Sequence, residues 1–323
     1  THIPFSLLYA LAALPEETLR QHVLNLERAE FLDETDQFPN LAYSLKHVLT
    51  QEVAYASLLH ERRRALHARV VEVLEALSPE GVVDQVERLA YHAFRGEVWD
   101  KAVRYYRHAA IKATARSANL ESVECFEQGL AALQRLPESP EKVEQAIDLR
   151  LELRPTLLQL GRLQELLAVS KEAETLAQQL GDEPRVARVY TYLINYHYLR
   201  GEPAVAVDYG ERCLAIAQRT RDESLAALTE RYLGLIAHVQ GDYRRAADLL
   251  KQSIGRLEAV RENDVNATVS YVAATGWRAF TLAELGDFDE AYALLDRAQH
   301  AADASRHAYS QAIAYTLQGL VWL

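Results

Sequence analysis

Methionine is absent from the 323-residue sequence, and cysteine occurs only twice, as Cys125 and Cys213. Because these cysteines have no C-x-x-C spacing, they provide neither a disulfide framework nor a zinc site. We therefore predict no metal site and a reducing compartment, the cytoplasm. No apolar run approaches the ~20 residues that a membrane span needs, and no signal peptide begins the chain, so we expect no membrane partner.

Catalytic signatures are also lacking. The sequence contains no G-x-x-x-x-G-K-[ST] phosphate-binding loop, no H-E-x-x-H, no G-x-S-x-G and no protein-kinase signature. We therefore predict no catalytic residue, no enzyme activity and no cofactor in this part of the protein. The net charge of −11 argues against a nucleic-acid footprint over the whole surface, so we do not expect nucleic acid as a partner.

What the chain does have is helical periodicity, and its 13 glycines and 9 prolines are few, as in a mostly helical protein. In residues 229–254, apolar residues recur at helical spacing on both sides of Gly241-Asp242. Glycine can adopt the left-handed conformation that ends a helix, so we predict two amphipathic helices joined by a tight turn. Leu233-Gly234, Ala246 and Leu250 fall where the tetratricopeptide (TPR) pattern has L-G followed by A-x3-F.

This unit recurs around four turn glycines, Gly161, Gly201, Gly241 and Gly286, which are 40, 40 and 45 residues apart. The spacing exceeds the TPR period of about 34 residues, which predicts longer helices or links. One helix pair cannot bury its own apolar face, so neighbouring pairs must stack. We therefore predict an all-α fold: a TPR-like α-solenoid of antiparallel helix pairs, with a small N-terminal winged-helix-like part.

The N-terminal part is predicted to cover residues 1–47. Residues 1–30 have the pattern of two short helices. Phe31-Leu32 and Tyr43–Leu45 flank a polar loop with Pro39-Asn40, which predicts a hairpin. Two helices followed by a hairpin are typical of a winged helix-turn-helix.

The remaining residues are predicted to be helical throughout. We assign residues 48–137 to a helical linker with the first helix-turn-helix units, and residues 138–323 to the TPR-like repeats. Pro155 predicts a kink or an early break in the first repeat helix. The chain ends inside the apolar pattern of residues 308–323, so we expect the repeat array to be truncated there.

The runs YSLKHVLTQEVAY at residues 43–55 and SLLHERRRALH at residues 57–67 resemble a segment of large bacterial signalling ATPases of the STAND class. Such ATPases are often fused to a class III nucleotide cyclase or a protein kinase domain. The repeats also resemble those of the maltose-regulon activator family. The resemblance implies an ATP- or ADP-binding domain before residue 1, in contact with this part, and a nucleotide-sensing role for His47.

Two clusters in this segment have more than one interpretation. His47 is either the nucleotide sensor or a helix-start residue bonded to the local backbone. Arg62, Arg63 and Arg64 are consecutive on one helix and form either a solvated face or a basic patch. That patch would dock on the nucleotide-binding domain or contact phosphates.

The predicted binding surface lies on the first helix of two repeats, because TPR arrays bind partners along the groove that these helices line. Counting back from the turn glycines places six polar or aromatic side chains on that face: Arg188, Thr191, Asn195, Tyr198, Arg231 and His238. A polar, aromatic and partly basic groove suits an extended acidic peptide or a chain terminus. The alternative is that the tyrosines pack between neighbouring helices with their hydroxyls at the rim.

Three functions fit these observations. The first is a non-catalytic interaction and sensor module of a STAND-type ATPase, in which a protein or peptide in the groove regulates the attached nucleotide-binding and output domains. The second is the sensor part of a transcription regulator of the maltose-activator type. The third is a free-standing TPR adaptor that binds peptides.

Overall fold

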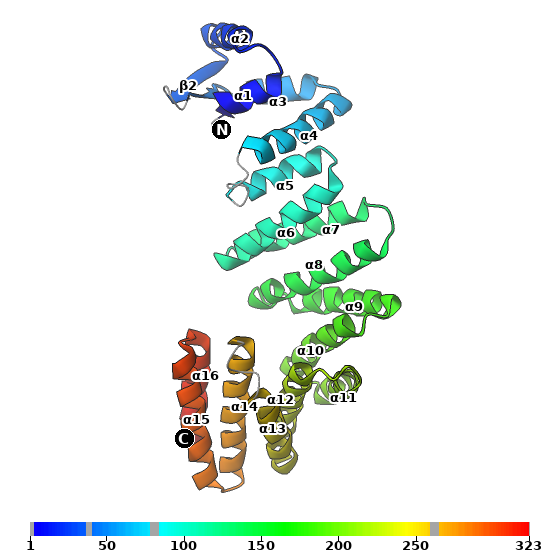
Figure 1. The fold of residues 1–323 in the computed structure, drawn as a ribbon, viewed down its shortest axis with the longest axis vertical. Coiled ribbons are helices and arrows are strands. Elements are labelled where there is room, and N and C mark those ends of the chain that lie inside the picture. The colour runs from blue at the N-terminus through cyan, green and yellow to red at the C-terminus, as the bar shows by residue number, and fades with distance from the viewer. Residues whose placement is uncertain (1–2, 37–40, 78–83, 259–264, 323) are drawn as a thin grey trace. The chain divides into compact units, whose positions relative to one another are not determined.

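A computed structural model describes residues 3–36, 41–77, 84–258 and 265–322. The described residues form sixteen helices and three short strands (Figure 1). They divide into two compact units, Thr1–Arg162 and Leu163–Leu323, which we describe one at a time.

The first unit begins with a small sheet and two helices. Its elements are β1 (Ile3–Pro4), α1 (Phe5–Ala12), α2 (Glu16–Arg28), β2 (Leu32–Asp36) and β3 (Ala42–Leu45). The strands are antiparallel in the order β1-β3-β2, so the predicted hairpin is confirmed, although its loop residues 37–40 lie outside the described residues. Leu19 and Val23 of α2 pack against Tyr43 of β3 and form the small core of this part.

The first unit continues with six helices. They are α3 (Val48–Ser57), α4 (His60–Leu77), α5 (Val86–Arg95), α6 (Trp99–Ala115), α7 (Asn119–Gln134) and α8 (Pro140–Gln159). From α4 onward, each helix contacts its successor within the unit. The α8 helix starts where Ser139 accepts a hydrogen bond from the Lys142 N–H, at 3.2 Å, with proline at the first helical position.

The prediction of an early break at Pro155 is wrong, because α8 continues through this residue to Gln159. A proline inside a helix removes one backbone hydrogen bond and clashes with the preceding turn. Here Leu151, Leu153 and Leu157 are all buried on both sides of the proline, and their packing holds the helix together.

The second unit consists of helices only. They are α9 (Leu163–Leu180), α10 (Glu183–Leu199), α11 (Pro203–Thr220), α12 (Glu223–Val239), α13 (Tyr243–Glu258), α14 (Val265–Glu284), α15 (Phe288–Ser305) and α16 (Ala308–Trp322). The pairs α10/α11, α12/α13 and α14/α15 turn at Gly201, Gly241 and Gly286, whose φ angles are 70°, 80° and 83°. The helices α10, α12, α14 and α16 also contact one another in that order, and we call them the first-helix row. The predicted α-solenoid of antiparallel pairs is confirmed.

Close helix contacts in this unit depend on glycine. A Cβ atom at Gly234 of α12 would lie 2.7 Å from Leu250 Cγ of α13. A Cβ atom at Gly276 of α14 would lie 2.5 Å from Leu317 Cδ1 of α16. Both distances are shorter than carbon atoms tolerate, so each glycine makes room for a leucine side chain from a neighbouring helix.

The predicted domain boundaries coincide with helix starts. His47 is the residue before α3, and residues 137–138 lie just before α8. The division into compact units instead follows Arg162, at the turn between α8 and α9. The three predicted domains therefore stay a prediction.

Candidate functional site

The predicted groove residues of α10 differ in exposure. Arg188 is exposed and its Nε donates to the Tyr192 hydroxyl at 3.3 Å. Thr191 is buried, and its hydroxyl donates to the Arg188 carbonyl oxygen at 2.8 Å. Asn195 and Tyr198 are half-buried, and burial raises the pKa of the Tyr198 hydroxyl. The helix thus offers Arg188, Asn195 and Tyr198 to a ligand, whereas Thr191 bonds to its own backbone.

On α12, Arg231 is half-buried and its guanidinium carbon lies 4.3 Å from the centroid of the Tyr232 ring. Its Nε is buried and has no hydrogen-bond partner. No carboxylate pairs with this guanidinium among the described residues. A buried donor without a partner is unfavourable, and the half-buried guanidinium leaves only its exposed part to an acceptor that a ligand supplies.

His238 lies inside the helix packing. The residue is buried, and its Nδ1 lies 3.0 Å from the Thr281 hydroxyl oxygen of α14. Its ring contacts the rings of Tyr243, Trp277 and Phe280. Burial lowers the pKa of His238, so the ring stays neutral at physiological pH. This histidine connects α12, α13 and α14, so we do not assign it to the ligand-binding surface.

Asn195 and Arg231 are predicted groove residues on neighbouring helices. They lie on α10 and α12, which contact each other directly in the first-helix row. Within the described ranges, the Asn195 amide also has no hydrogen-bond partner. An amide can donate to and accept from a peptide group, and a guanidinium can hold a carboxylate with two parallel hydrogen bonds.

The three arginines of the predicted basic patch differ in their contacts. Arg62 is exposed, whereas Arg64 pairs with Glu97 at 3.2 Å. The Arg63 guanidinium carbon lies 5.1 Å from the centroid of the Tyr55 ring. Of these three arginines, only Arg62 is therefore free to bind a partner.

His47 is exposed and precedes the first turn of α3. Its backbone carbonyl oxygen accepts from the Thr50 N–H at 3.1 Å, while its side chain makes no capping hydrogen bond. The backbone role matches the helix-start interpretation, and the imidazole is left accessible to a partner.

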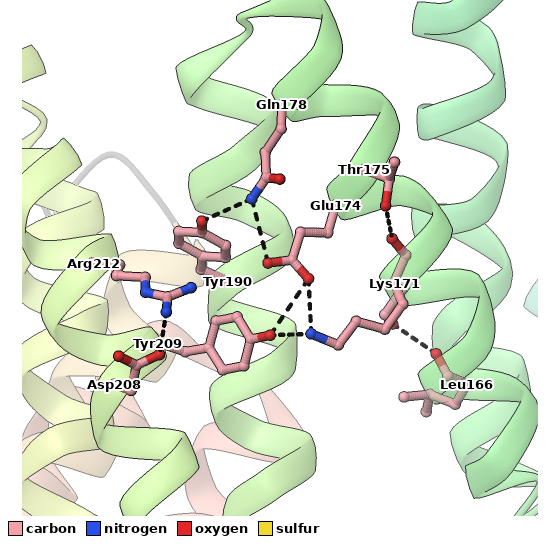
Figure 2. Close-up of polar contacts among 10 residues, drawn as sticks. Leu166, Lys171, Glu174, Thr175, Gln178, Tyr190, Asp208, Tyr209 and Arg212 are labelled. Carbon is pink, nitrogen blue, oxygen red and sulfur yellow. Dashed lines mark hydrogen bonds and ion pairs between the residues drawn. The ribbon is translucent and has the colours of Figure 1, made fainter.

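A polar network that the sequence did not reveal connects α9 to α10 and α11 (Figure 2). The Lys171 ammonium donates to the Tyr209 hydroxyl and lies 2.9 Å from the Glu174 carboxylate. Gln178 donates to Glu174 at 3.4 Å and to the Tyr190 hydroxyl at 3.2 Å. The network holds three helices in register, because each member bonds to another member.

Charge in this network is balanced internally. Burial lowers the pKa of Lys171, but the hydrogen bonds to Tyr209 and Glu174 outweigh it and raise that pKa overall. The Tyr209 ring also stacks on His197, with 5.7 Å between ring centroids. Lysine and glutamate three residues apart gave a sequence signal for the ion pair. No local signal identified Tyr209, which is 38 residues away from Lys171.

The described residues of the first unit form pockets of different character. One, of about 280 Å³, is lined by α6 and α8 and includes Arg104 and Arg107. These arginines are already paired, with Glu75 at 3.5 Å and Glu152 at 2.8 Å, so they offer little free positive charge. Another, of about 620 Å³, is apolar and lies between the hairpin and α3, with Leu26, Phe31, Leu45, Leu49 and Val53 among its lining residues.

Metal binding and membrane crossing find no support in the part of the chain that the structure describes. That part contains no group of three or more His, Cys, Asp or Glu side chains placed to hold a metal ion. None of its helices combines the length and the apolar character that crossing a bilayer requires. Burial raises the pKa of both thiols, Cys125 and Cys213, to about 11, so neither is an activated nucleophile.

Comparison with known proteins identifies the fold. No family model matches the sequence, and no curated protein matches it. Among solved structures, aspartyl phosphate phosphatase F from Bacillus subtilis has a TM-score of 0.61 at 13% identity and covers 98% of this chain and 76% of its own. NprR, in complex with its cognate peptide NprX, has a TM-score of 0.52 at 14% identity. The match covers 98% of this chain and 82% of the NprR chain.

A third solved structure contains nearly identical TPR-like repeats of the kinesin light chain type, from Podosopora anserina. It has a TM-score of 0.51 at 19% identity and covers 64% of this chain and 97% of its own. At these identities the likeness concerns the fold alone. The chain is similar to TPR-like helical-repeat proteins in its architecture.

Proposed function

We propose that this chain is a non-catalytic protein-interaction module that binds an extended peptide on the first-helix row of its second unit. The observation that carries the proposal is the pair of unsatisfied side chains, Asn195 on α10 and Arg231 on α12. An amide and a guanidinium on neighbouring helices suit a peptide backbone that is followed by an acidic side chain or a terminal carboxylate. A module that works by binding alone needs no cofactor or metal.

The similarity to NprR supports this proposal indirectly. That protein has the same helical-repeat architecture and was crystallised with its cognate peptide. Peptide recognition by an elongated row of helices uses the repeated spacing of side chains along the row. Arg188 and Tyr198 would extend the surface along α10 on both sides of Asn195.

The test is a peptide array carrying acidic fifteen-residue sequences with free carboxyl ends, probed with the intact chain. We expect saturable binding that Asn195→Ala and Arg231→Ala each weaken by about tenfold, the effect of losing one hydrogen bond worth about 1.4 kcal/mol. Arg244→Ala is the matched control, because Arg244 is an exposed arginine on α13, outside the first-helix row. Retention of peptides that both substitutions leave unchanged would contradict the proposal.

We also propose that the module belongs to a cytoplasmic signalling ATPase of the STAND type, with its nucleotide-binding domain before residue 1. The resemblance of residues 43–67 motivates this, and two observations support it. The two helices α1 and α2, followed by the β2-β3 hairpin, agree with the predicted winged-helix-like part. The apolar pocket beside α3 and the exposed Arg62 and His47 offer a surface for an intramolecular contact.

Sequencing the complete reading frame tests this second proposal directly. A phosphate-binding loop upstream, followed by ADP retention that His47→Ala lowers, is the expected result. A DNA-binding domain downstream would favour the transcription regulator of the maltose-activator type. Neither domain on either side would leave a free-standing peptide adaptor.

A further inference from the structure

Two histidines face each other where α4 packs on α5 in the first unit (Figure 1). The Nδ1 atoms of His67 on α4 and His92 on α5 lie 2.8 Å apart, and their ring centroids lie 5.0 Å apart. His67 Nε2 lies 3.0 Å from the Tyr55 hydroxyl oxygen of α3. His67 is buried and His92 is half-buried, so His92 is the more accessible of the two. We call His67 and His92 the histidine pair.

The contact between the two Nδ1 atoms has room for one hydrogen, because two N–H groups cannot point at each other across 2.8 Å. In a neutral pair, one Nδ1–H donates to the other Nδ1 atom, and one of the two Nε2 atoms carries a hydrogen. One added proton places a hydrogen on the second Nε2 atom and leaves the contact intact. The histidine pair can therefore take up one proton, but not two, without moving apart.

Two guanidiniums stack on tyrosine rings beside the histidine pair. The guanidinium carbon of Arg63 lies 5.1 Å from the centroid of the Tyr55 ring, and that of Arg95 lies 5.7 Å from the centroid of the Tyr91 ring. Each tyrosine ring is 5.8 Å, between centroids, from the ring of the α4 histidine. From α6, Tyr106 lies within reach of the Arg95 charge, and burial raises the pKa of its hydroxyl, so this group stays neutral. Stacking thus holds positive charge on both sides of the pair.

The arginines act on the histidine pair electrostatically. Burial lowers the pKa of His67, and the positive charges of Arg95 and Arg63 lower it further. Burial, His67 and Arg88 lower the pKa of His92 to about 4. Without an anion to offset the arginine charges, both imidazoles therefore stay neutral at physiological pH.

Arg88 and Arg95 of α5 are exposed, and neither pairs with a carboxylate in the described part of the first unit. The acidic side chains nearest in sequence are used elsewhere. Glu87 pairs with Lys112 at 3.1 Å, and Glu97, in the turn after α5, pairs with α4 at 3.2 Å. The two arginines are seven residues apart, so they lie on one face of the helix. This face carries two positive charges that an anion would balance.

We propose that Arg88, Arg95 and the histidine pair bind a phosphate monoester, and that the pair takes up one proton when this anion binds. Such a group carries a charge of about −1.5 to −2 at pH 7 and three acceptor oxygens. The charge matches two unpaired guanidiniums, and the oxygens match their planar donors together with the Nε2–H group of His92. Because the anion offsets the arginine charges that oppose protonation, anion binding and proton uptake strengthen each other.

The probe is sulfate, a tetrahedral dianion whose charge stays constant between about pH 5.5 and about pH 7.5. It is titrated into the intact chain at constant ionic strength, in exchange for chloride, and followed by the ring-proton resonances of selectively labelled histidine. We expect saturable binding that is about three- to tenfold tighter at the lower pH, because the pair takes up at most one proton over part of this range. His92→Gln should remove this pH dependence, and the resonance that it deletes identifies His92.

Three variants make the test specific. Arg88→Gln and Arg95→Gln are each expected to weaken sulfate binding by about fivefold or more, since each removes a charged donor. Arg135→Gln is the matched control, because Arg135 is an exposed arginine of the first unit that also lies on an aromatic ring, 6.0 Å from the Trp99 centroid, without a histidine pair. It should bind sulfate as the unsubstituted chain does.

Inorganic phosphate and a short phosphoserine peptide then distinguish the source of the phosphate group. Tighter binding of the peptide places the group on a protein, whereas equal binding makes the free ion the ligand. Three outcomes would overturn the proposal. They are the absence of saturable binding at constant ionic strength, equal weakening by Arg135→Gln and Arg95→Gln, and the same affinity for sulfate at both pH values.

Discussion

The same substitution, glycine to alanine, has different consequences at two helix positions of the second unit. At one position it changes helix propensity alone, and at the other it also creates a clash with a neighbouring helix. In an open helix interior, this replacement stabilises the folded state by about 1 kcal/mol. Gly255 meets that condition, because nothing lies within 4 Å of its Cβ position. Gly234 does not, because its Cβ would lie 2.7 Å from Cγ of the fully buried Leu250. Overpacking of this kind costs about 1–3 kcal/mol.

We therefore expect Gly255→Ala to stabilise the chain, and Gly234→Ala to be less stable than Gly255→Ala by about 1–3 kcal/mol. For a unit of this size, each kcal/mol corresponds to a shift of about 2–4 °C in the melting temperature. The assay is thermal and urea unfolding followed by circular dichroism at 222 nm, with an unchanged urea slope as the control for compactness.

A double substitution tests the cause. Leu250→Ala alone is expected to cost about 2–5 kcal/mol, because it leaves a cavity in the core. In the Gly234→Ala background the cost should be smaller by about 1–3 kcal/mol, since the new methyl group no longer meets Leu250. Equal stability of Gly234→Ala and Gly255→Ala, or strict additivity in the double variant, would refute the reasoning.

Three further predictions follow from single sites. Gly241→Ala should destabilise by about 1–2 kcal/mol in urea unfolding, because φ there is 80° and a Cβ atom disfavours that conformation. Arg231→Met should leave stability unchanged or raise it by up to about 1 kcal/mol, because it removes a buried donor without a partner, while it weakens peptide binding by about tenfold. Burial, His67 and Arg88 lower the pKa of His92 from 6.5 to about 4, so between these values the unfolded chain binds a proton that folded His92 does not. The free energy of unfolding is therefore retained above pH 6.5 and falls by at most about 3 kcal/mol as the pH drops towards 4. Urea titrations at a series of pH values should show that His92→Gln flattens this dependence.

The fold of the repeats could be predicted because its determinants are local. Gly201, Gly241 and Gly286 end their helices with positive φ, as the turn pattern predicted. The hairpin of β2 and β3 followed from two apolar segments around a polar loop. The early break predicted at Pro155 is wrong, because buried leucines on both sides of this residue keep α8 intact. Local propensity is weaker than several buried contacts.

The candidate site could be predicted only in part. Helical periodicity placed Arg188, Asn195 and Arg231 on the same row of helices, and the structure leaves all three at least partly exposed. Periodicity could not show that Thr191 bonds to its own helix. Nor could it show that His238 meets Thr281, which is 43 residues away.

Apolar spacing and glycine specify the helices, their pairing and the turns between them, because these signals act within a few residues. Which polar groups find hydrogen-bond partners depends instead on tertiary packing. Lys171 donates a hydrogen bond to Tyr209, whereas Arg231 pairs with no carboxylate within the described residues. The reason is physical: a hydrogen bond between helices depends on how the helices pack, and residues far apart in the chain set that geometry.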